Sequence, residues 1–322
     1  MMAERRPISL RVSVTDRCDE RCLYCRPAGG VTLVPRRDVL RFEEITRFVR
    51  AIKANFGLSK VRLTGGEPLI RRGLADLVRR LSLEGIGDLA LTTNGQRLAD
   101  MAMALCRAGL RRVNVSLDSL DRTTYRRLTR GANLSRTLAG IEAARACGLK
   151  PVKLNMVVLR GINDHEVVAL ARFGLERDCE VRFLELMPIG VAATSHERWF
   201  VSSTEVRERV ARAMELVPLA EEPDKASRSF LARDSAGRSG RIGFVSPCSV
   251  PFCETCRRLR LTATGRLLGC LGQTRGIDVR ALLRESGERD EALLCGAVEE
   301  ALRLKRGGPR FAEQELMVRI GG

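Results

Sequence analysis

The sequence has few aromatic residues and no long apolar run. One Trp, two Tyr and ten Phe make up 4% of its 322 residues. Because the bases of single-stranded nucleic acids stack on aromatic side chains, this shortage argues against nucleic acid as a partner. No run of about 18 apolar residues occurs, so we expect no membrane-spanning helix. Residues 1–7 lack the apolar stretch of a signal peptide, and we therefore expect a cytoplasmic protein.

Lysine is scarce as well. Only six of the 56 basic residues are lysines, arginine supplies the rest, and the formal net charge is +17. Such a surplus suits a phosphate-rich ligand. A coding bias toward arginine, together with a solvated surface, also accounts for most of these residues. Charge alone does not distinguish a nucleotide from a nucleic acid.

Cysteine, in contrast, is abundant, with eleven residues. In a reducing compartment these are not expected to form disulfides. Six fall into two tight clusters, and Cys248 lies beside the second. The other four, Cys106, Cys147, Cys179 and Cys295, stand in apolar or helical contexts, so we expect them to be buried small residues.

A repeated pattern predicts an α/β fold. A helical stretch ends at Gly57, Gly85, Gly109 and Gly148, and each glycine is followed by an apolar residue and a β-branched run. Strand, helix, strand, helix indicates a parallel sheet with right-handed crossovers. The expected strands lie near 8–14, 60–64, 88–93, 112–117, 151–158 and 180–186. Six strands are too few for a closed barrel of eight, so we expect an incomplete, TIM-like (β/α)6 barrel.

The rhythm ends near residue 190. We expect a helix near 203–217, a charged flexible loop over 220–240, and helices near 277–285 and 290–305. The sequence thus predicts two domains, a partial barrel over 1–190 and a smaller α+β domain over 191–322 that closes the barrel mouth. In barrels of this kind the chemistry lies at the C-terminal ends of the strands.

The first cysteine cluster directly follows the first expected strand. Cys18, Cys22 and Cys25 form a C-x3-C-x2-C spacing. Three thiolates on one short loop can hold three irons of a [4Fe–4S] cluster, whose usual ligand count is four. The remaining iron is then open to a ligand with an amine and a carboxylate. The alternative is a structural zinc loop, which needs a fourth ligand and other spacings.

This loop resembles that of the radical S-adenosylmethionine superfamily, in which a cluster cleaves S-adenosylmethionine to a 5′-deoxyadenosyl radical. The segment Gly65-Gly66-Glu67-Pro68 after the second strand supports the resemblance. Glycine lets a backbone approach a ligand closely, and a glutamate can accept a hydrogen bond from an ammonium group. The resemblance implies an S-adenosylmethionine site made of Tyr24, Gly66, Glu67, Ser116 and Met187.

The second cluster consists of Cys253, Cys256 and Cys270, again three thiols, and a second iron–sulfur cluster with an open iron fits them. A zinc ribbon completed by Cys248 is the alternative. Arg258 lies two residues after Cys256 and Arg260 two residues further on, so in an extended chain both arginines point to one side. Two guanidinium groups on one face can clamp a phosphate, although a solvated strand face would give the same spacing.

Nearly the whole chain resembles the GTP 3′,8-cyclases of molybdenum-cofactor biosynthesis, from the segment 10–18 through 112–121 and 161–164 to the terminal Gly321-Gly322. The resemblance implies two [4Fe–4S] clusters and a C-terminal Gly-Gly that reaches into the site. It also implies a GTP site made of Arg11, Arg62, Thr93, Lys153, Arg258 and Arg260. The implied partners are GTP, S-adenosylmethionine, an electron donor such as flavodoxin or ferredoxin, and the downstream cyclic pyranopterin monophosphate synthase. We expect a monomer or a homodimer.

Three positions depart from that pattern. The resemblance predicts Met where Arg26 stands, Met or Thr where Cys248 stands, and Asn or Thr where Arg257 stands. If Cys248 were a fourth ligand, the second cluster would be saturated and could not bind guanine. The chain would then be a paralogue with another small molecule or a peptide as substrate. A cysteine-rich zinc protein that binds nucleic acid is the non-enzyme alternative, and it leaves the Gly-Gly-Glu-Pro segment unexplained.

Overall fold

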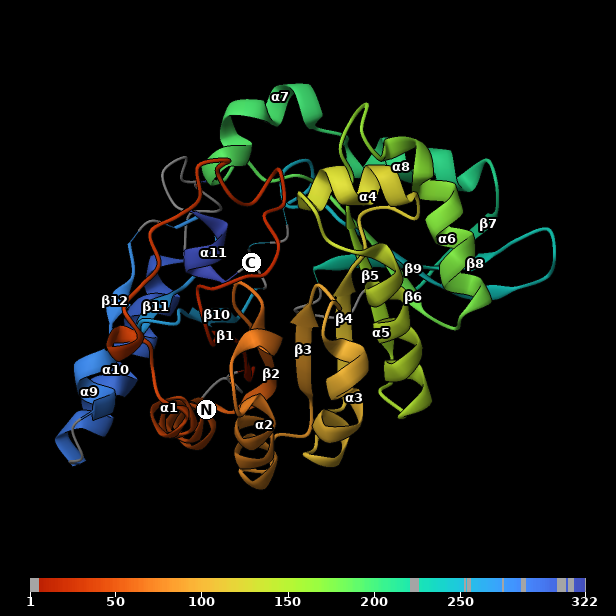
Figure 1. The fold of residues 1–322 in the computed structure, drawn as a ribbon. Helices are drawn as coiled ribbons and strands as arrows, with labels where there is room; N and C mark the ends of the chain where they lie inside the picture. The colour runs from red at the N-terminus through yellow and green to blue at the C-terminus, as the bar shows by residue number, and fades with distance from the viewer. Residues whose placement is uncertain are drawn as a thin grey trace.

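The computed structural model describes residues 6–220, 226–251, 253, 256–273, 275–284, 288–305, 311 and 316–321. Within these ranges the strands form one sheet of twelve, in the order β12-β11-β10-β1-β2-β3-β4-β5-β6-β9-β8-β7. Figure 1 shows this sheet curving around a central space, with helices along its outer face. Its edge strands do not pair with each other, so the barrel is partial and open.

The six predicted strands are confirmed. They are β1 (Ile8–Ser13), β2 (Leu58–Thr64), β3 (Leu89–Thr93), β4 (Arg112–Ser116), β5 (Val152–Val157) and β6 (Glu180–Leu184). Each pairs in parallel with the next. The connecting helices are α1 (Phe42–Phe56), α2 (Leu74–Leu83), α3 (Leu98–Arg107), α4 (Arg122–Thr129), α5 (Leu134–Ala146) and α6 (Val167–Glu176).

The helices pack on the sheet through the faces that their apolar period predicts. In α1, Ile45, Phe48 and Val49 are fully buried, and in α2 so are Leu77 and Leu81. Burying side chains of this kind stabilises the fold by roughly 1.5–3 kcal/mol each. The result is a continuous apolar layer between helices and sheet, which fixes the inner ends of the strands.

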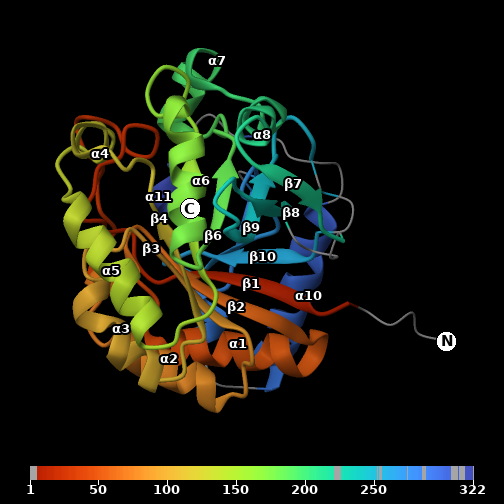
Figure 2. The ribbon, with the colours of Figure 1, turned by 90° about the vertical axis from the view of Figure 1, so that its right-hand side faces the viewer.

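The C-terminal segment adds to the same sheet. Its elements are α7 (His196–Trp199), α8 (Ser203–Ala211), β7 (Glu215–Pro218), β8 (Ser227–Arg233), β9 (Ser239–Val245), β10 (Arg258–Leu261), β11 (Arg266–Leu268), β12 (Ile277–Asp278), α9 (Arg280–Arg284), α10 (Glu288–Leu304) and α11 (Met317–Ile320). β10 pairs in parallel with β1, and β9 with β6. Figure 2 shows β10 beside β1. The parallel part of the sheet therefore extends beyond the six predicted strands at both ends.

Several predictions for this segment are wrong. The stretch 220–240 is not a loop where it is described, because β8 and the start of β9 form an antiparallel hairpin there. Its exposed side chains include Arg228, Arg233 and Arg241 beside Leu231, so the stretch is more charged than a strand usually is. The helix expected near 203–217 ends at Ala211, and β7 follows it. The helix expected near 277–285 is shorter, because residues 277–278 form β12 and α9 starts only at Arg280. The division at residue 190 stays a prediction.

The four scattered cysteines are only partly as expected. Cys179 is buried, 3% exposed, and burial raises its pKa to about 11. Cys106, Cys147 and Cys295 are half-buried instead. Cys106 and Cys147 lie at the C-terminal ends of α3 and α5, where the helices reach the rim of the molecule. Among the described residues, no helix combines the length and apolarity needed to cross a membrane.

The pairing of β10 with β1 makes a prediction about stability. Leu259 on β10 is fully buried opposite Leu10. Leu259→Ala should lower the free energy of unfolding by about 2–5 kcal/mol, because it removes apolar contacts and leaves a cavity. Urea unfolding followed by circular dichroism measures this. Leu83→Ala, at a position 81% exposed on α2, is the control and should change little. Equal effects would contradict a shared core.

Candidate active site

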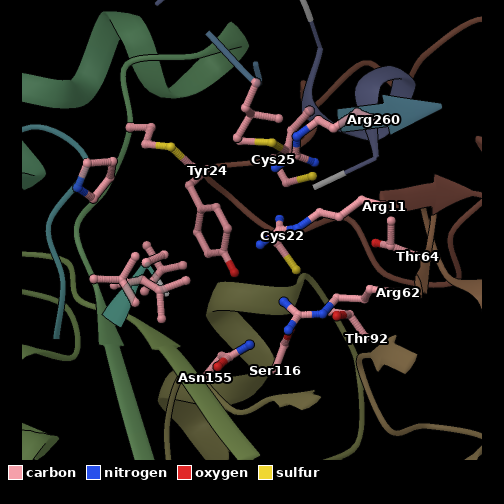
Figure 3. Close-up of a pocket in the computed structure, with 18 of the residues that line it drawn as sticks. Arg11, Cys22, Tyr24, Cys25, Arg62, Thr64, Thr92, Ser116, Asn155 and Arg260 are labelled. Carbon is pink, nitrogen blue, oxygen red and sulfur yellow. The ribbon is translucent and has the colours of Figure 1, made fainter. Parts of the chain in front are cut away.

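One cavity gathers almost all predicted site residues. It has a volume of about 330 Å³ and lies at the C-terminal ends of the strands. The predicted residues that line it are Arg11, Cys18, Cys22, Tyr24, Cys25, Arg62, Gly66, Glu67, Thr93, Ser116, Met187, Cys253, Cys256, Arg258, Arg260 and Cys270. Figure 3 shows the labelled members of this set converging from several strands and loops. Lys153 is the one predicted site residue that lies outside it.

Backbone contacts with α4 hold the loop that carries the first three cysteines. The amide of Arg21 donates to the carbonyl of Thr129 at 3.1 Å, and that of Leu23 to Leu128 at 2.9 Å. Within the loop, the amide of Cys25 donates to the carbonyl of Cys22 at 3.0 Å. The loop is therefore a fixed turn and keeps its three thiols at one wall of the cavity.

Gly66 allows the end of β2 to pass directly beside this loop. The amide of Gly66 donates to the carbonyl of Thr15, and that of Glu67 to the carbonyl of Arg17, each at 2.7 Å. A Cβ atom on Gly66 would lie 2.2 Å from the oxygen of Arg17, which is inside van der Waals contact. Only glycine fits at this position, so the close approach explains the glycine pair of the sequence.

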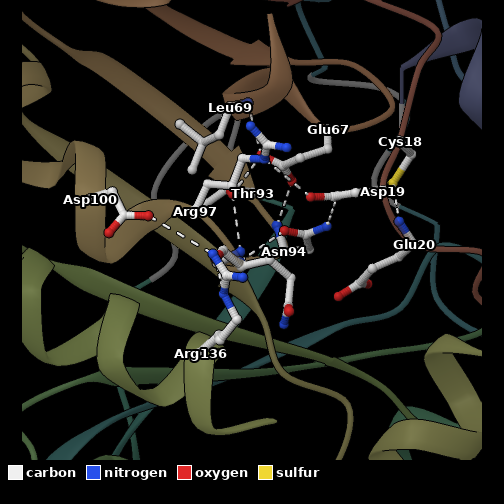
Figure 4. Close-up of polar contacts among 12 residues, drawn as sticks. Cys18, Asp19, Glu20, Glu67, Leu69, Thr93, Asn94, Arg97, Asp100 and Arg136 are labelled. Carbon is white, nitrogen blue, oxygen red and sulfur yellow. Dashed lines mark hydrogen bonds and ion pairs between the residues drawn. The ribbon is translucent and has the colours of Figure 1, made fainter. Parts of the chain in front are cut away.

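Glu67 is a buried carboxylate held by three donors, as Figure 4 shows. Its Oε1 accepts from the amide of Leu69 at 2.9 Å and from Oγ1 of Thr93 at 2.7 Å, and its Oε2 accepts from the amide of Asn94 at 2.7 Å. Burial nevertheless raises the pKa of Glu67 to about 7. Asn94 in turn donates to Asp19 of the cysteine loop at 2.7 Å. The carboxylate is thus fixed in place and tied to that loop.

Tyr24 points across the cavity to the strand ends. Its hydroxyl donates to Oδ2 of Asp118 at 2.6 Å, and Oδ1 of Asp118 accepts from the amide of Val157 at 2.9 Å. Burial raises the pKa of Asp118 to about 6. Ser116 and Asn155 lie nearby (Figure 3). No role was predicted for Asp118, although its place at the end of β4 was a usable signal.

Arginines from three neighbouring strands form the opposite side. Arg11 lies on β1, Arg62 on β2, and Arg258 and Arg260 on β10. Burial and the other three guanidinium groups lower the pKa of Arg11 well below its usual value. Burial likewise lowers the pKa of Arg62 to about 9 and that of Arg260 to about 10. Such a concentration of positive charge favours an anionic ligand with several negative charges.

Lys153 lies in an adjoining cavity of about 670 Å³, which shares Arg11, Arg62 and Asn155 with the first. Its ammonium group forms a buried ion pair with Glu180. Burial lowers the pKa of Lys153 to about 7. The sequence did not predict the other cations of this cavity, Lys60, Arg112, Arg182 and Arg241. These cations alternate with apolar residues along their strands. A strand with one face in water shows the same alternation, so the sequence does not reveal a cavity there.

The second set of cysteines lines the first cavity from the C-terminal segment. The amide of Cys256 donates to the carbonyl of Cys253 at 3.2 Å, and Cys270 lies beyond β11. Burial acts to raise the pKa of Cys256, but the cations Lys305 and Arg258 hold it below its usual value. Lys305 lines the cavity too and was not predicted. Two groups of three thiols thus face the same space.

Comparison with known proteins places this arrangement in a family. The sequence model of the Radical SAM superfamily matches residues 12–174, and that of Molybdenum Cofactor Synthesis C matches residues 179–310. A GTP 3′,8-cyclase of Pelotomaculum thermopropionicum is 46% identical over 322 residues, which cover 97% of this chain and 97% of that protein. The GTP 3′,8-cyclase of Marinobacter nauticus is 45% identical over 298 residues, 92% of this chain and 88% of that protein. The chain belongs to the radical SAM superfamily and, within it, to the GTP 3′,8-cyclase family.

Solved structures of other radical SAM enzymes share the fold. Streptococcus suis SuiB bound to S-adenosylmethionine superimposes with a TM-score of 0.63 at 15% identity, over 97% of this chain and 77% of that one. SuiB bound to its precursor peptide SuiA gives a TM-score of 0.62 at the same identity, over 97% and 76%. At this identity the likeness concerns the fold alone.

The thiols fit the iron–sulfur clusters and S-adenosylmethionine that radical SAM enzymes use. Burial raises the pKa of Cys25 to about 11, and it also raises the pKa values of Cys18 and Cys22. Without a bound cation these groups therefore stay protonated at neutral pH. Iron supplies the positive charge that stabilises buried thiolates, and sulfur is the donor that it takes in such clusters. Three thiols in each group match a [4Fe–4S] cluster with one open iron.

Cys248 belongs to a different set of contacts. Its amide donates to Oε2 of Glu185 at 3.0 Å, and its thiol to the carbonyl of Leu186 at 3.5 Å. Glu185 also accepts from Ser249 and from the amide of Ser203. Cys248 does not appear among the residues that line the cavity. These contacts favour a second cluster held by three cysteines over one saturated by Cys248.

Cys248→Ser should therefore leave the metal content unchanged. Serine keeps the hydrogen bond from the backbone amide to Glu185, and its hydroxyl can donate to the carbonyl of Leu186. Iron and sulfide, measured per chain after anaerobic reconstitution, should equal the wild-type values, whereas Cys270→Ser should lose up to one cluster. A loss of iron in Cys248→Ser equal to that in Cys270→Ser would mean that Cys248 is a ligand.

Proposed function

We propose that this chain converts GTP to (8S)-3′,8-cyclo-7,8-dihydroguanosine 5′-triphosphate in molybdenum-cofactor biosynthesis. The observation that carries the proposal is the convergence of two three-cysteine groups and four arginines on one cavity. Relatives that are named GTP 3′,8-cyclase and match nearly the whole chain support it. When bound at Cys18, Cys22 and Cys25, a cluster with S-adenosylmethionine supplies the radical that starts the reaction.

The chain's own residues would hold S-adenosylmethionine against the first cluster. Glu67, fixed by Leu69, Thr93 and Asn94, offers a carboxylate to the ammonium group. Ser116 would donate to the methionine carboxylate, and Tyr24 and Met187 would flank the adenine. Asp118 orients Tyr24 by accepting its hydroxyl proton in a hydrogen bond. Thr93, which is predicted to bind GTP, donates to Glu67 and so also supports the carboxylate that would hold S-adenosylmethionine.

The arginines would bind the triphosphate and so orient the nucleotide. Arg11, Arg62 and Arg258 lie between the first cavity and the adjoining one, since they line both. A triphosphate can therefore extend toward Lys153 while guanine faces Cys253, Cys256 and Cys270. Holding the reacting groups in this way can contribute roughly 7–11 kcal/mol to a reaction. Buried guanidinium groups favour phosphate over the peptide substrate of a paralogous radical enzyme.

The remaining assignments follow from the same reaction. A one-electron donor such as flavodoxin or ferredoxin would reduce the first cluster, and the cyclic pyranopterin monophosphate synthase would consume the product. Both would meet the chain in the cytoplasm. We further propose that residues 1–190 and 191–322 act as two domains, the second carrying the cluster that binds guanine. A monomer or homodimer accommodates this scheme, because both cysteine groups come from one chain.

Substitutions in the two cysteine groups should have different effects in a turnover assay. Cys25→Ala should abolish the reductive cleavage of S-adenosylmethionine by dithionite, measured as 5′-deoxyadenosine under anaerobic conditions. Cys270→Ala should retain cleavage but form no cyclised nucleotide from GTP, because the base is no longer oriented. Cys295→Ala, in α10 and outside the cavity, is the control and should keep both activities. Cleavage retained by Cys25→Ala would refute the proposal.

The pKa of Glu67 makes binding of S-adenosylmethionine depend on pH. Because burial raises this pKa to about 7, the carboxylate prevails above pH 7 and becomes protonated below it. Affinity should therefore fall about tenfold per pH unit below 7 as the attraction for the ammonium group is lost. Calorimetry with S-adenosylhomocysteine and the iron-loaded protein measures this. Glu67→Gln should bind weakly with no such dependence, and a flat wild-type profile would contradict the role.

A further inference from the structure

We propose that Arg26 is a positioning residue that braces the loop of Cys18, Cys22 and Cys25 and makes the cluster on this loop easier to reduce. The inference rests on the proposed function, because it concerns the same cysteine loop. It concerns a position where this chain departs from the Met that the family resemblance predicts. The argument has two parts, the hydrogen bonds of the side chain and its charge.

The side chain of Arg26 ties the end of the loop to its start. It directly follows Cys25 and is only 8% exposed. Its Nη1 donates to the carbonyl of Cys18 at 3.1 Å and to that of Glu20 at 3.3 Å. Its amide donates to the carbonyl of Cys22 at 3.1 Å. One residue thus donates to three carbonyl groups of the cysteine loop.

A second arginine holds the first in place. Nη1 of Arg130 donates to the carbonyl of Arg26 at 2.9 Å. Arg130 follows the last residue of α4 and has a left-handed backbone conformation, with φ of 55°. Few residues other than glycine adopt this conformation. Its position is also fixed by the bond from the amide of Arg21 to Thr129, one residue earlier. The chain from α4 through Arg130 to Arg26 therefore fixes the loop from behind.

The charge of Arg26 acts on the sulfur ligands. Arg26 directly follows Cys25 in the sequence, and the carbonyls of Cys18 and Glu20 hold its guanidinium group within the loop. The Glu20 carboxylate is itself directed to the thiol of Cys22 and the hydroxyl of Tyr125. Arg26 thus places a fixed positive charge within the loop that carries Cys18, Cys22 and Cys25.

Burying this charge costs free energy that a neutral side chain would avoid. Its Nε is buried without a hydrogen-bond partner in the described residues. A well-packed apolar residue, such as the Met expected here, would be as stable or more stable in such a place. Reduction of a cluster adds one negative charge, and net charge and hydrogen bonding around the sulfurs set its potential. A fixed cation stabilises the reduced form, so it raises the potential.

Three substitutions separate charge from hydrogen bonding. Arg26→Lys keeps the charge, Arg26→Gln keeps a donor without charge, and Arg26→Met removes both. Each protein, reconstituted anaerobically, is titrated against potential while its electron paramagnetic resonance spectrum is recorded. The signal that changes when S-adenosylmethionine is added reports the first cluster. Iron per chain is measured on the same samples.

We expect Arg26→Gln and Arg26→Met to shift the midpoint of this signal to more negative potential. A shift on the order of tenfold in the reduction equilibrium corresponds to about 59 mV for one electron. Arg26→Lys should keep most of the wild-type midpoint, and Arg26→Met should also retain less iron. Arg257→Met is the matched control, because Arg257 follows Cys256 as Arg26 follows Cys25. It should leave the signal that responds to S-adenosylmethionine in place.

A wild-type midpoint in Arg26→Gln at full iron content would overturn the role of charge. So would an equal shift in Arg26→Lys and Arg26→Gln, since the lost fork of hydrogen bonds would then be the cause. Should neither neutral variant bind iron, Arg26→Lys decides, because a cluster with the wild-type midpoint supports the proposal and a shifted one overturns it. A wild type without any signal that responds to S-adenosylmethionine would instead refute the proposed function.

Discussion

The close contact between two backbone segments is the constraint on which the active site depends. The end of β2 runs against residues 15–17, joined by the amides of Gly66 and Glu67. This contact requires a position with no Cβ, because the oxygen of Arg17 occupies that space. It sets the distance between the cysteine loop and Glu67, two parts of a single cofactor site. The contacts of Asn94 with Glu67 and of Tyr24 with Asp118 depend on the position that these two backbone hydrogen bonds give to β2 and the cysteine loop.

The positive charge of the site is stabilised less well by the protein than by its ligand. Arg11, Arg62 and Arg260 are buried beside one another, and each has a lowered pKa because burial and like charges disfavour the charged form. A triphosphate relieves that repulsion, and any ligand that binds only the folded state adds to its stability. The adjoining cavity differs, because Glu180 pairs with Lys153 and Arg182 there and Asp88 pairs with Arg112. We therefore expect selectivity for highly charged anions to depend on the arginines that both cavities share.

The sequence predicts the local parts of this fold well and its distant pairings poorly. The six inner strands are visible because each is an apolar run with a polar end, and a glycine precedes four of them, a pattern contained within a few residues. The pairing of β10 with β1 joins residues such as Leu259 and Leu10, which are far apart along the chain. Periodicity carries no information about such a pairing. The edge hairpin of β8 and β9 was not predicted for another reason, since Arg228 and Arg233 are both exposed and make the stretch resemble a charged loop.

The same distinction holds for the site. Cysteine spacing and the glycine pair are local patterns, so the sequence alone predicts the cysteine ligands and Glu67. Buried charges are harder to predict, because a lysine or arginine on a strand gives the same pattern whether it faces water or a cavity. Lys153 was predicted to bind GTP, which stays a prediction, and it lies in the adjoining cavity with Glu180, a partner that comes from the next strand. Arg26 shows the limit most clearly, because its departure from the family pattern was visible but its two acceptors, the carbonyls of Cys18 and Glu20, exist only once the loop has folded back on itself.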